Sequence, residues 1–466
     1  MKAARESGFA YQAVYRYLMR LMAESACDGN SRLPSLRQLA DRLNVSISTI
    51  QYAYSLLEKE GRIYSVAKSG YYARAVSGVT PPAMSNDLLE TLYVNARHPG
   101  MRLLNADDPV SLQSLDSPLL LLERELLRQY PRQPPLLDQP CGELELRAVL
   151  AARYTTSPKQ CWHAEDVYIG ADMRGVLEIL VAVLQLRHTT ILVESPCDWV
   201  ILRLLQAAEV RVIELPLQAC GGLELQRLET LLKTEDVRLI LLSSGLCMPR
   251  GTQVPADNRN VIAGLLGEHG TWVLENDCYG ELGEATGVER LRDQLDPDRL
   301  LVFSTFEKFI GIEAPYGYVL SRQWKHEMQR HFLMRSFRLS PVRQKAIARL
   351  YGNGRVDQHL HVLRRLLKER RTPMIDLLRE RLGEALQVVE PQGGATVWVR
   401  ARRPVDMRDV FQRLLRQQVL IAPGELFSLQ GLHRRHLRLN LLDHGESGLG
   451  GALERLGEAL RLAPLE

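Results

Sequence analysis

The sequence of 466 residues has no run of about 18 apolar residues, and its N-terminus has no apolar signal core. We therefore expect no transmembrane helix, no membrane partner and a cytoplasmic location. The seven cysteines form no CxxC pair and no His/Cys cluster. This scatter argues against a disulfide framework and against structural zinc, and we predict no metal site. Cys278 is interpreted as a small packing residue.

The net charge and the length limit the possible partners and the number of domains. A formal net charge of +4 is too mild to indicate a partner. Basic residues outnumber acidic ones within residues 1–74, which is where a phosphate-binding surface would be expected. No internal repeat or low-complexity tract is present. The length is too great for one core and predicts about two or three domains.

Residues 33–72 contain the most informative pattern. Two apolar stripes at helical spacing predict two short helices, one formed by Leu36, Leu39, Ala40 and Leu43 and the other by Ile50, Ala53, Tyr54 and Leu57. Between them, Asn44-Val45-Ser46 predicts a tight turn in which Ser46 caps the second helix. A helix, a short turn and a second helix form the geometry that enters the major groove of DNA.

The start of the predicted second helix carries small hydroxyl and amide groups. Ser46, Ser48, Thr49 and Gln51 are able to reach base edges or phosphates. Further along, residues 63–66 and 71–73 alternate like a hairpin closed around Lys68-Ser69-Gly70. The pattern predicts a wing with a basic tip, formed by Lys68 and Gly70.

This segment, with its opening Leu33-Pro34-Ser35-Leu36-Arg37, resembles the winged helix-turn-helix of the GntR family. The resemblance implies binding to a double-stranded DNA operator, with Arg37, Ser48, Thr49 and Gly70 at positions associated with DNA contact. Many members carry an arginine directly after the serine that opens the recognition helix. This chain has Ile47 there.

The rest of the chain predicts an α/β architecture in four parts. Residues 1–75 form the DNA-binding domain, 76–116 a linker, 117–340 a large domain and 341–466 a smaller α+β lobe. Apolar β-runs alternate with helices in the large domain, at 167–169, 190–193, 210–213, 239–242, 272–274 and 300–303. Such a pattern favours a parallel-rich sheet covered on both faces.

Several loops after these runs carry residues with related chemistry. Lys308 can form a Schiff base with an aldehyde. Asp277 can pair with a pyridinium nitrogen, and Tyr279 can donate to a phenolic oxygen of the same ring. The backbone of Gly170-Ala171-Asp172 can meet a phosphate before a helix. Arg438 offers a guanidinium for a carboxylate.

Taken together, these residues resemble the fold-type I aminotransferases, which bind pyridoxal 5′-phosphate. A GntR-type head on such a body resembles the MocR subfamily of transcription regulators. The YdcR-like branch is the most similar, through VESPC, ENDCYGEL, PQGGATVWV, PGELFS and LRLN.

The resemblance implies that Lys308 is the Schiff-base lysine and that Asp277 and Tyr279 are the partners of the ring. It places Thr305 and the loop of Gly170, Ala171 and Asp172 at the phosphate, and Arg438 at an effector carboxylate. It also implies a domain-swapped homodimer in which each DNA head lies over the partner's body.

Four positions of the large domain depart from the family pattern. Met248 replaces an asparagine that contacts the ring hydroxyl, Glu307 replaces a serine, and Pro315 replaces a phosphate-binding arginine. Asp198 stands at the position of the ring-stacking aromatic, with Trp199 adjacent. Two outcomes follow: the cofactor binds, or the pocket serves another ligand, and the matching lysine, aspartate, tyrosine and arginine favour the cofactor. The first interpretation is a regulator that senses pyridoxal phosphate, an amino compound condensing with it, or another small molecule. The alternatives are an aminotransferase with a DNA-binding head and a cofactor-free regulator whose large domain is a sensor or dimerisation scaffold.

Overall fold

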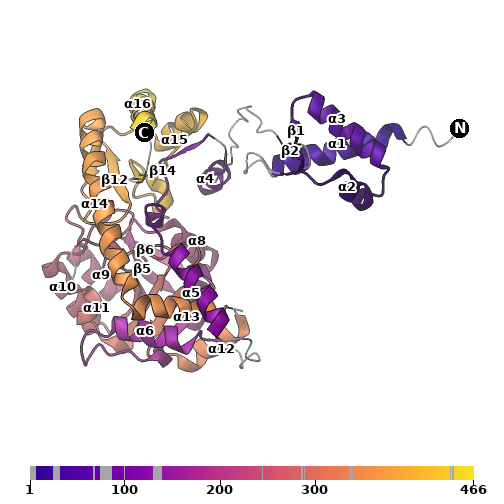
Figure 1. The fold of residues 1–466 in the computed structure, drawn as a ribbon. Helices are drawn as coiled ribbons and strands as arrows, with labels where there is room; N and C mark the ends of the chain where they lie inside the picture. The colour runs from indigo at the N-terminus through magenta and orange to yellow at the C-terminus, as the bar shows by residue number, and fades with distance from the viewer. Residues whose placement is uncertain are drawn as a thin grey trace. The chain divides into compact units, whose positions relative to one another are not determined.

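The computed structural model describes residues 7–24, 32–66, 69–73, 85, 87–98, 100–129, 139–243, 245–284, 287, 289–335, 339–440, 442 and 446–465. The chain divides into two compact units, Met1–Met101 and Arg102–Glu466, whose elements are labelled in Figure 1. Among these described residues, none of the helices has the length and apolar character needed to span a membrane. Within the same ranges, no group of His, Cys, Asp and Glu side chains could hold a metal ion.

The first unit contains the predicted recognition helices and wing. Its described elements are α1 (Ser7–Glu24), α2 (Leu36–Leu43), α3 (Ile47–Lys59), β1 (Ile63–Val66), β2 (Gly70–Ala73) and α4 (Leu88–Asn95). Ser35 and Gln38 form a capping box at the start of α2, and Ser46 caps α3 by accepting from the Thr49 N–H. Asn44 takes the left-handed conformation between the two helices, with φ 52°. The predicted helix-turn-helix and hairpin are confirmed.

The core of the first unit explains why these elements form. The two apolar stripes point inward, and Leu39, Ile50 and Leu57 are fully buried. Tyr54 is also fully enclosed and donates its hydroxyl to the Pro34 carbonyl at 2.7 Å. This bond satisfies the polar end of a buried ring and ties α3 to the segment that leads into α2.

A mixed sheet of seven strands forms the centre of the described part of the second unit. Its order is β4-β10-β9-β8-β7-β5-β6. The strands are β4 (Val167–Gly170), β5 (Thr190–Ser195), β6 (Arg211–Pro216), β7 (Val237–Leu242), β8 (Trp272–Asn276), β9 (Leu300–Thr305) and β10 (Gly317–Ser321). The five strands from β9 to β6 pair in parallel, and β10 is antiparallel to β9 and β4. Each predicted apolar run coincides with a strand, whereas β10 was not predicted.

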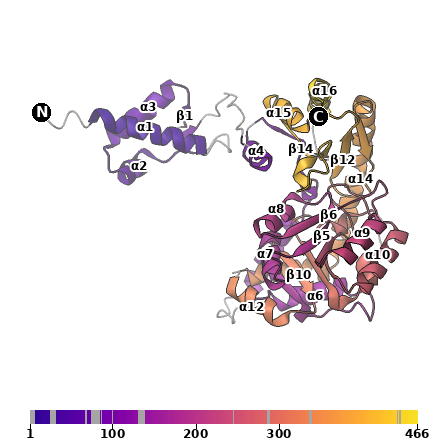
Figure 2. The same cartoon turned by 180° about the vertical axis from the view of Figure 1, so that it is seen from behind.

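Helices cover both faces of this sheet (Figures 1 and 2). They are α5 (Asp116–Gln129), α6 (Leu144–Tyr154), α7 (Met173–Val183), α8 (Trp199–Ala207), α9 (Leu225–Thr234), α10 (Ala256–Glu268), α11 (Leu291–Gln294), α12 (Lys325–Arg335) and α13 (Pro341–Gly352). Short 3₁₀ turns are η1 (Pro109–Ser111), η2 (Ala164–Asp166), η3 (Gly280–Leu282) and η4 (Pro297–Arg299). Because both faces are covered, the strands are apolar nearly throughout, which is why they were recognisable in the sequence.

The C-terminal part of the second unit is the predicted α+β lobe. The long helix α14 (Arg355–Leu382) leads into β11 (Leu386–Val389), β12 (Thr396–Ala401), α15 (Met407–Arg416), β13 (Val419–Leu420), β14 (Ala422–Pro423), η5 (Gly424–Phe427), β15 (His436–Asn440) and α16 (Glu446–Leu462). Four of its strands form a sheet in the order β11-β12-β15-β14.

The segment predicted to be a linker, 76–116, is divided between the units. Its last part belongs to the second unit, because β3 (Arg102–Leu103) pairs in parallel with β13. The Leu104 N–H donates to the Leu420 carbonyl at 2.8 Å, and the Leu104 side chain is fully buried. Residues 102–108, called the arm below, are therefore an ordered part of the body. Proline and glycine punctuation suggested a linker, but the pairing that orders the arm comes from residues about 300 positions later in the chain.

Candidate functional site

The lysine and tyrosine predicted to form the site lie at the carboxyl ends of neighbouring parallel strands. Tyr279 follows β8 and Lys308 follows β9. The Asp277 N–H donates to the Phe303 carbonyl at 2.9 Å, which fixes the start of the first loop against β9. The Lys308 ammonium lies 5.6 Å from the centre of the Tyr279 ring. The carboxyl edge of an open sheet is where ligands collect, and the structure brings these two residues together there.

Arg438 reaches the same site from β15 of the C-terminal lobe. Its side chain is 3% exposed, and its guanidinium lies 4.5 Å from the centre of the Trp199 ring and 5.2 Å from that of Phe427, two rings that contact each other. It donates to the Asn105 backbone carbonyl at 2.6 Å. The guanidinium is thereby oriented by stacking and by the arm, as a carboxylate-binding arginine requires.

Asp107 of the arm links these three side chains. Its carboxylate accepts from Lys308 at 3.2 Å, from the Tyr279 hydroxyl at 3.0 Å and from Arg438 at 2.8 Å. Burial alone would raise the pKa of Asp107, but the charges of Lys308 and Arg438 outweigh burial and hold that pKa below its ordinary value. The site therefore contains an ionised carboxylate that belongs to the chain itself. Sequence reasoning missed Asp107, since its only local signal is an acidic pair before Pro109.

The same ion pair determines the state of Lys308. Burial alone would lower the pKa of the Lys308 amine, but Asp107 and the other negative groups nearby hold it well above its ordinary value. A protonated amine has no lone pair with which to attack an aldehyde. The ion pair with Asp107 therefore favours the cationic form of Lys308.

Asp277, the predicted partner of a ring nitrogen, is occupied by protein groups. Its side chain is fully enclosed and pairs with Arg290 at 2.9 Å and with Arg292 at 3.0 Å. The Tyr154 hydroxyl donates a third bond at 2.7 Å. Burial alone would raise the pKa of Asp277, but the two arginines outweigh burial and lower it. Sequence reasoning found the aspartate and missed both of its cationic partners.

The residues predicted to meet a phosphate are adjacent in the sheet. Gly317 of β10 lies opposite Gly170 on one side and opposite Thr305 on the other. Ala171 and Asp172 follow Gly170 at the start of α7. A side chain at Gly317 would have its Cβ 2.6 Å from the Asp172 backbone, so only glycine permits this close approach.

The Asp172 carboxylate and protein hydrogen bonds occupy the groups that were predicted to meet a phosphate. The Asp172 side chain accepts from the Gly175 N–H at 2.7 Å and so occupies the N-terminus of α7. The Glu307 N–H donates to the Thr305 hydroxyl at 3.3 Å, and that hydroxyl donates to the Tyr316 carbonyl at 3.3 Å.

Two arginines that could replace the cation removed at Pro315 are engaged by other protein groups. Arg343 pairs with Glu313 at 3.1 Å and with Glu123 at 2.9 Å. Arg250, from the loop that also carries Met248, donates to the carbonyls of Leu217 and Ala219 at 2.8 and 3.1 Å. The described residues therefore fit a ligand carboxylate at Arg438, but they do not fit the phosphate of pyridoxal phosphate.

The predicted DNA-contact residues are grouped at the surface of the first unit. Arg37, Ser46, Ser48 and Gln51 are exposed and Thr49 is partly exposed. The Ser46 hydroxyl lies 2.9 Å from that of Ser48 and 2.7 Å from that of Thr49, so these hydroxyls form one polar cluster at the start of α3. Lys68 lies outside the described residues.

Two further surface residues near the wing and α3 were missed. Gly70 has φ 115°, a conformation that favours glycine, and a Cβ at this position would lie 3.6 Å from the Arg32 guanidinium. Arg32 therefore lies beside the wing. Tyr52 is 53% exposed on α3 and makes an edge contact with Tyr11.

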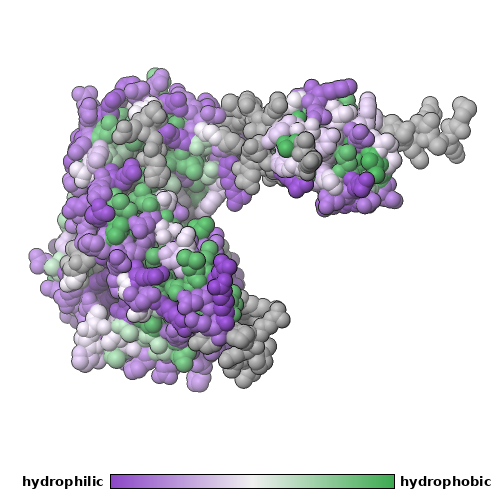
Figure 3. All heavy atoms as spheres, viewed as in Figure 1, coloured by the Kyte–Doolittle hydropathy of each residue, from purple (hydrophilic) through white to green (hydrophobic). Residues whose placement is uncertain are grey.

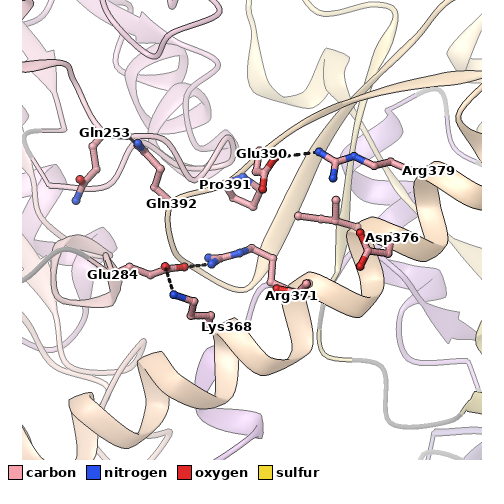
Figure 4. A pocket seen from close by; sticks show the side chains of 11 residues that line it. Gln253, Glu284, Lys368, Arg371, Asp376, Arg379, Glu390, Pro391 and Gln392 are labelled. Carbon is pink, nitrogen blue, oxygen red and sulfur yellow. Dashed lines mark hydrogen bonds and ion pairs between the residues drawn. The ribbon is translucent and has the colours of Figure 1, made fainter.

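A separate cavity of about 470 Å³ lies between α14 and three loops of the second unit, at Gln253, at Glu284 and at residues 390–392 (Figure 4). Arg371 and Lys368 both pair there with Glu284, and Arg379 pairs with Glu390 at 2.9 Å. None of the residues predicted to bind a ligand lines this cavity. Five of its charged side chains, those of Glu284, Lys368, Arg371, Arg379 and Glu390, are paired with one another, so we interpret it as a structural ion-pair cluster.

The fold and the site define a class of protein. Residues 138–456 match the class I and II aminotransferases, and the chain belongs to this family. Residues 10–72 match the gntR family of bacterial regulatory proteins, so the first unit is a GntR-type helix-turn-helix.

Relatives with the same two parts are known over the full length. The chain is 27% identical to the uncharacterized HTH-type transcriptional regulator YjiR of Escherichia coli, over 96% of this chain and 98% of the relative. It is 25% identical to the regulator YdcR of the same organism, over 97% and 99%. The two-part organisation is consistent with the MocR subfamily.

Solved aminotransferases share the fold of the second unit. The α-aminoadipate aminotransferase LysN from Thermus thermophilus, solved with N-(5′-phosphopyridoxyl)-L-leucine, has a TM-score of 0.71 at 20% identity and covers 80% of this chain and 94% of its own. The kynurenine aminotransferase from Pyrococcus horikoshii has a TM-score of 0.72 at 21% identity, with 81% and 95% covered. This likeness confirms the fold-type I architecture.

Proposed function

We propose that the chain is a DNA-binding transcription regulator whose second unit senses a small carboxylate-bearing effector in the site formed by Lys308, Tyr279 and Arg438. The single observation that carries this proposal is the joining of a GntR-type recognition unit to a body whose lysine is held as a cation by Asp107. The GntR-type unit supports sequence-specific DNA binding. The ion-paired Lys308 supports binding of a ligand and argues against its catalytic conversion.

The chemistry of the site argues against an aminotransferase activity. Transamination requires an unprotonated lysine and a cofactor ring held rigidly as an electron sink. Here Lys308 is ion-paired, and both oxygens of Asp277 are engaged by Arg290, Arg292 and Tyr154. No step of the proposed function passes through a bound cofactor. Recognition of a carboxylate by Arg438 needs neither an unprotonated lysine nor a phosphate subsite.

The cofactor question has a direct test, which is the visible absorbance of the purified chain with added pyridoxal phosphate. We expect no band that depends on Lys308, so that the wild type and Lys308→Ala give the same spectrum. A band present only in the wild type would show that Lys308 holds the cofactor despite Asp107. In that case the effector would be an amino compound that condenses with it.

We propose that the active form is a homodimer in which each DNA-binding unit lies over the partner's body. Apolar residues gather over α5 on the face shown in Figure 3, where Leu121 is 65% exposed and Leu127 is 57% exposed. Patches of this kind mark surfaces that bind another protein. Sedimentation of the full chain should give the mass of a dimer, and Leu121→Lys with Leu127→Lys should shift it to a monomer. As a regulator of this kind, the protein is proposed to act in the cytoplasm.

DNA binding is tested by selecting duplexes from a random library with the full chain. We expect enrichment of one sequence, because the exposed Arg37, Ser48 and Gln51 offer both phosphate and base contacts. Ser48→Ala with Gln51→Ala should lose the sequence preference and keep weak, salt-sensitive binding. If the wild type enriched no sequence, the proposed function would be wrong.

A further inference from the structure

We propose that Asp107 is an internal occupant of the effector site, and that a small carboxylate ligand competes with it and releases the arm at the junction of the two units. This inference rests on the proposed function, because it concerns the same site. It adds a mechanism by which ligand binding in the second unit changes the attachment of residues 102–108, the segment that follows the DNA-binding unit in the chain.

The first support is the position of the Asp107 carboxylate. It contacts three groups from three parts of the body: Lys308 after β9, Tyr279 after β8 and Arg438 on β15. These are the groups that a ligand carboxylate would use. Removal of Asp107 would leave two cations side by side, which attract an anion strongly in a site shielded from water.

The second support is that Asp107 fits the site incompletely. The Arg438 Nε–H is buried and has no acceptor among the described residues. The Asn105 side-chain oxygen in the arm is also buried and without a donor within the same residues. An arginine prefers to hold a carboxylate through two parallel bonds, and Asp107 takes only one N–H of Arg438. A free carboxylate can turn to accept from Nε as well, so it can form one more hydrogen bond with Arg438 than Asp107 does.

The third support is that Asp107 is accessible. About a fifth of its side chain and of the Lys308 side chain remain exposed, at 21% each. An incoming anion can therefore approach the ion pair without prior opening of the core. Exchange of one carboxylate for another also keeps the charge of the site constant, which avoids the cost of an unpaired buried cation.

The arm provides the connection to the first unit. It begins at Arg102, the first residue of the second unit, and Asp107 lies five residues further along. Three sets of contacts hold it: the pairing of β3 with β13, the bonds from Asn440 to the carbonyls of Leu103 and Leu104, and the contacts of Asn105 and Asp107 with Arg438. Loss of the last set leaves the arm attached only by its first residues. Differential affinity of an effector for the two states of the arm then sets the size of the response.

The test uses acetate, whose carboxylate and methyl carbon correspond to the carboxylate and methylene carbon of the aspartate side chain. In Asp107→Ala, acetate should fill the vacated position and raise the melting temperature of the full chain. Its apparent affinity should exceed that for the wild type by about tenfold or more, because no internal carboxylate competes. Ethylammonium, which lacks a carboxylate, should have no such effect. Asp236→Asn, which removes the same charge from an exposed position, is the matched control and should behave as the wild type.

The position of acetate is checked with Asp107→Ala combined with Arg438→Gln, which should lose the rescue. Equal stabilisation of the wild type, Asp107→Ala and the double variant would overturn the proposal, because acetate would then act elsewhere. Asp107→Asn provides a milder variant if Asp107→Ala is poorly folded. It should also bind acetate more tightly than the wild type.

Coupling is measured by hydrogen exchange at the Leu104 amide and by operator affinity. In Asp107→Ala without acetate, exchange at Leu104 should be faster than in Asp236→Asn, and the affinity for the selected duplex should change by about threefold or more. Unchanged exchange and unchanged affinity would overturn the coupling. If the wild type selects a duplex and the acetate effects are absent, this inference fails while the proposed function stands. If no duplex is selected, the proposed function fails and the acetate results still decide whether Asp107 occupies the site.

Discussion

Asp277 and Arg292 form an ion pair of 3.0 Å in which the carboxylate is fully enclosed and the guanidinium is 10% exposed. Arg290 pairs with the other oxygen of Asp277, and Arg292 also pairs with Glu275 at 3.0 Å. The aspartate that the family pattern assigns to a cofactor ring is thus the centre of a charge cluster. Its role in this chain is to balance two guanidinium groups beneath the site.

The first prediction concerns this cluster. Asp277→Ala should lower the free energy of unfolding of the second unit by about 3 kcal/mol or more, because it leaves buried guanidinium groups without their carboxylate. Asp357→Ala removes an aspartate that is 64% exposed and paired with Arg153, and it should cost less than about 1 kcal/mol. Urea unfolding followed by circular dichroism compares the two. Equal costs would mean that Asp277 has no structural role of this kind.

The second prediction concerns pH and the buried Glu194. Burial raises the pKa of this carboxyl from 4.5 to about 7, although the Ser243 side chain and N–H both donate to it. The folded state therefore holds the proton more tightly than the unfolded state. The resulting stabilisation is complete below the ordinary pKa of 4.5 and is lost as the pH rises through about 7.

Glu194→Gln removes this titration and keeps a group that can bond to Ser243. Relative to the wild type, the variant should gain about 3 kcal/mol in unfolding free energy between about pH 4 and pH 8. Unfolding measured at a series of pH values gives the difference. A difference that does not change with pH would show that Glu194 does not titrate in this range.

Features that depend on residues close together in the sequence could be predicted, whereas features that depend on residues far apart could not. The helix-turn-helix was predictable because its apolar stripes, the Ser46 cap and the Asn44 turn are local signals. Lys308, Tyr279 and Arg438 were found because each follows or lies on a recognisable strand. Strand β10 was missed because its apolar run, Tyr318–Leu320, is short and is bounded by Gly317 and Ser321, and its antiparallel partners β4 and β9 are set by the sheet.

The parts of the site that escaped prediction are contacts between distant segments. Asp107 and Arg438 are separated by 331 positions, and no local pattern pairs an acid in an apparent linker with an arginine near the C-terminus. The two arginines that occupy Asp277 lie at the start of α11, a helix of four residues that is too short to show an apolar stripe. Electrostatic pairing of this kind is determined by the packed fold and not by the neighbouring sequence.

The third prediction separates DNA contact from folding in the first unit. Arg37→Ala should weaken operator binding by about tenfold and reduce the salt dependence by about one counterion, with unchanged unfolding, because this side chain is exposed. Ser46→Ala should lower the unfolding free energy by about 1 kcal/mol through loss of the cap on α3. Binding titrations at several salt concentrations and thermal unfolding distinguish the two. An unchanged salt slope in Arg37→Ala would remove Arg37 from the DNA interface.

The fourth prediction concerns the ion pairs of the cavity in Figure 4. Arg371 is 9% exposed and pairs with Glu284, whereas Arg379 is 52% exposed and pairs with Glu390, which is 70% exposed. Glu284→Gln should lower the free energy of unfolding by about 1–3 kcal/mol, since it leaves a buried cation underpaired. Glu390→Gln should change it by less than about 1 kcal/mol. A larger cost for Glu390→Gln would contradict the structural interpretation of the cavity.

The pairing of β3 with β13 also decides where the protein can be divided. The Asn440 N–H donates to the Leu104 carbonyl at 2.8 Å, so the arm lies against β15 as well as against β13. A body produced from Arg102 onward keeps both attachments. One produced from Asp116, at the first helix of the large domain, leaves the Leu420 carbonyl and the Asn440 N–H without their bonds to Leu104 and deprives Arg438 of the Asp107 carboxylate. The arm therefore folds as part of the C-terminal lobe, although it precedes the large domain in the sequence.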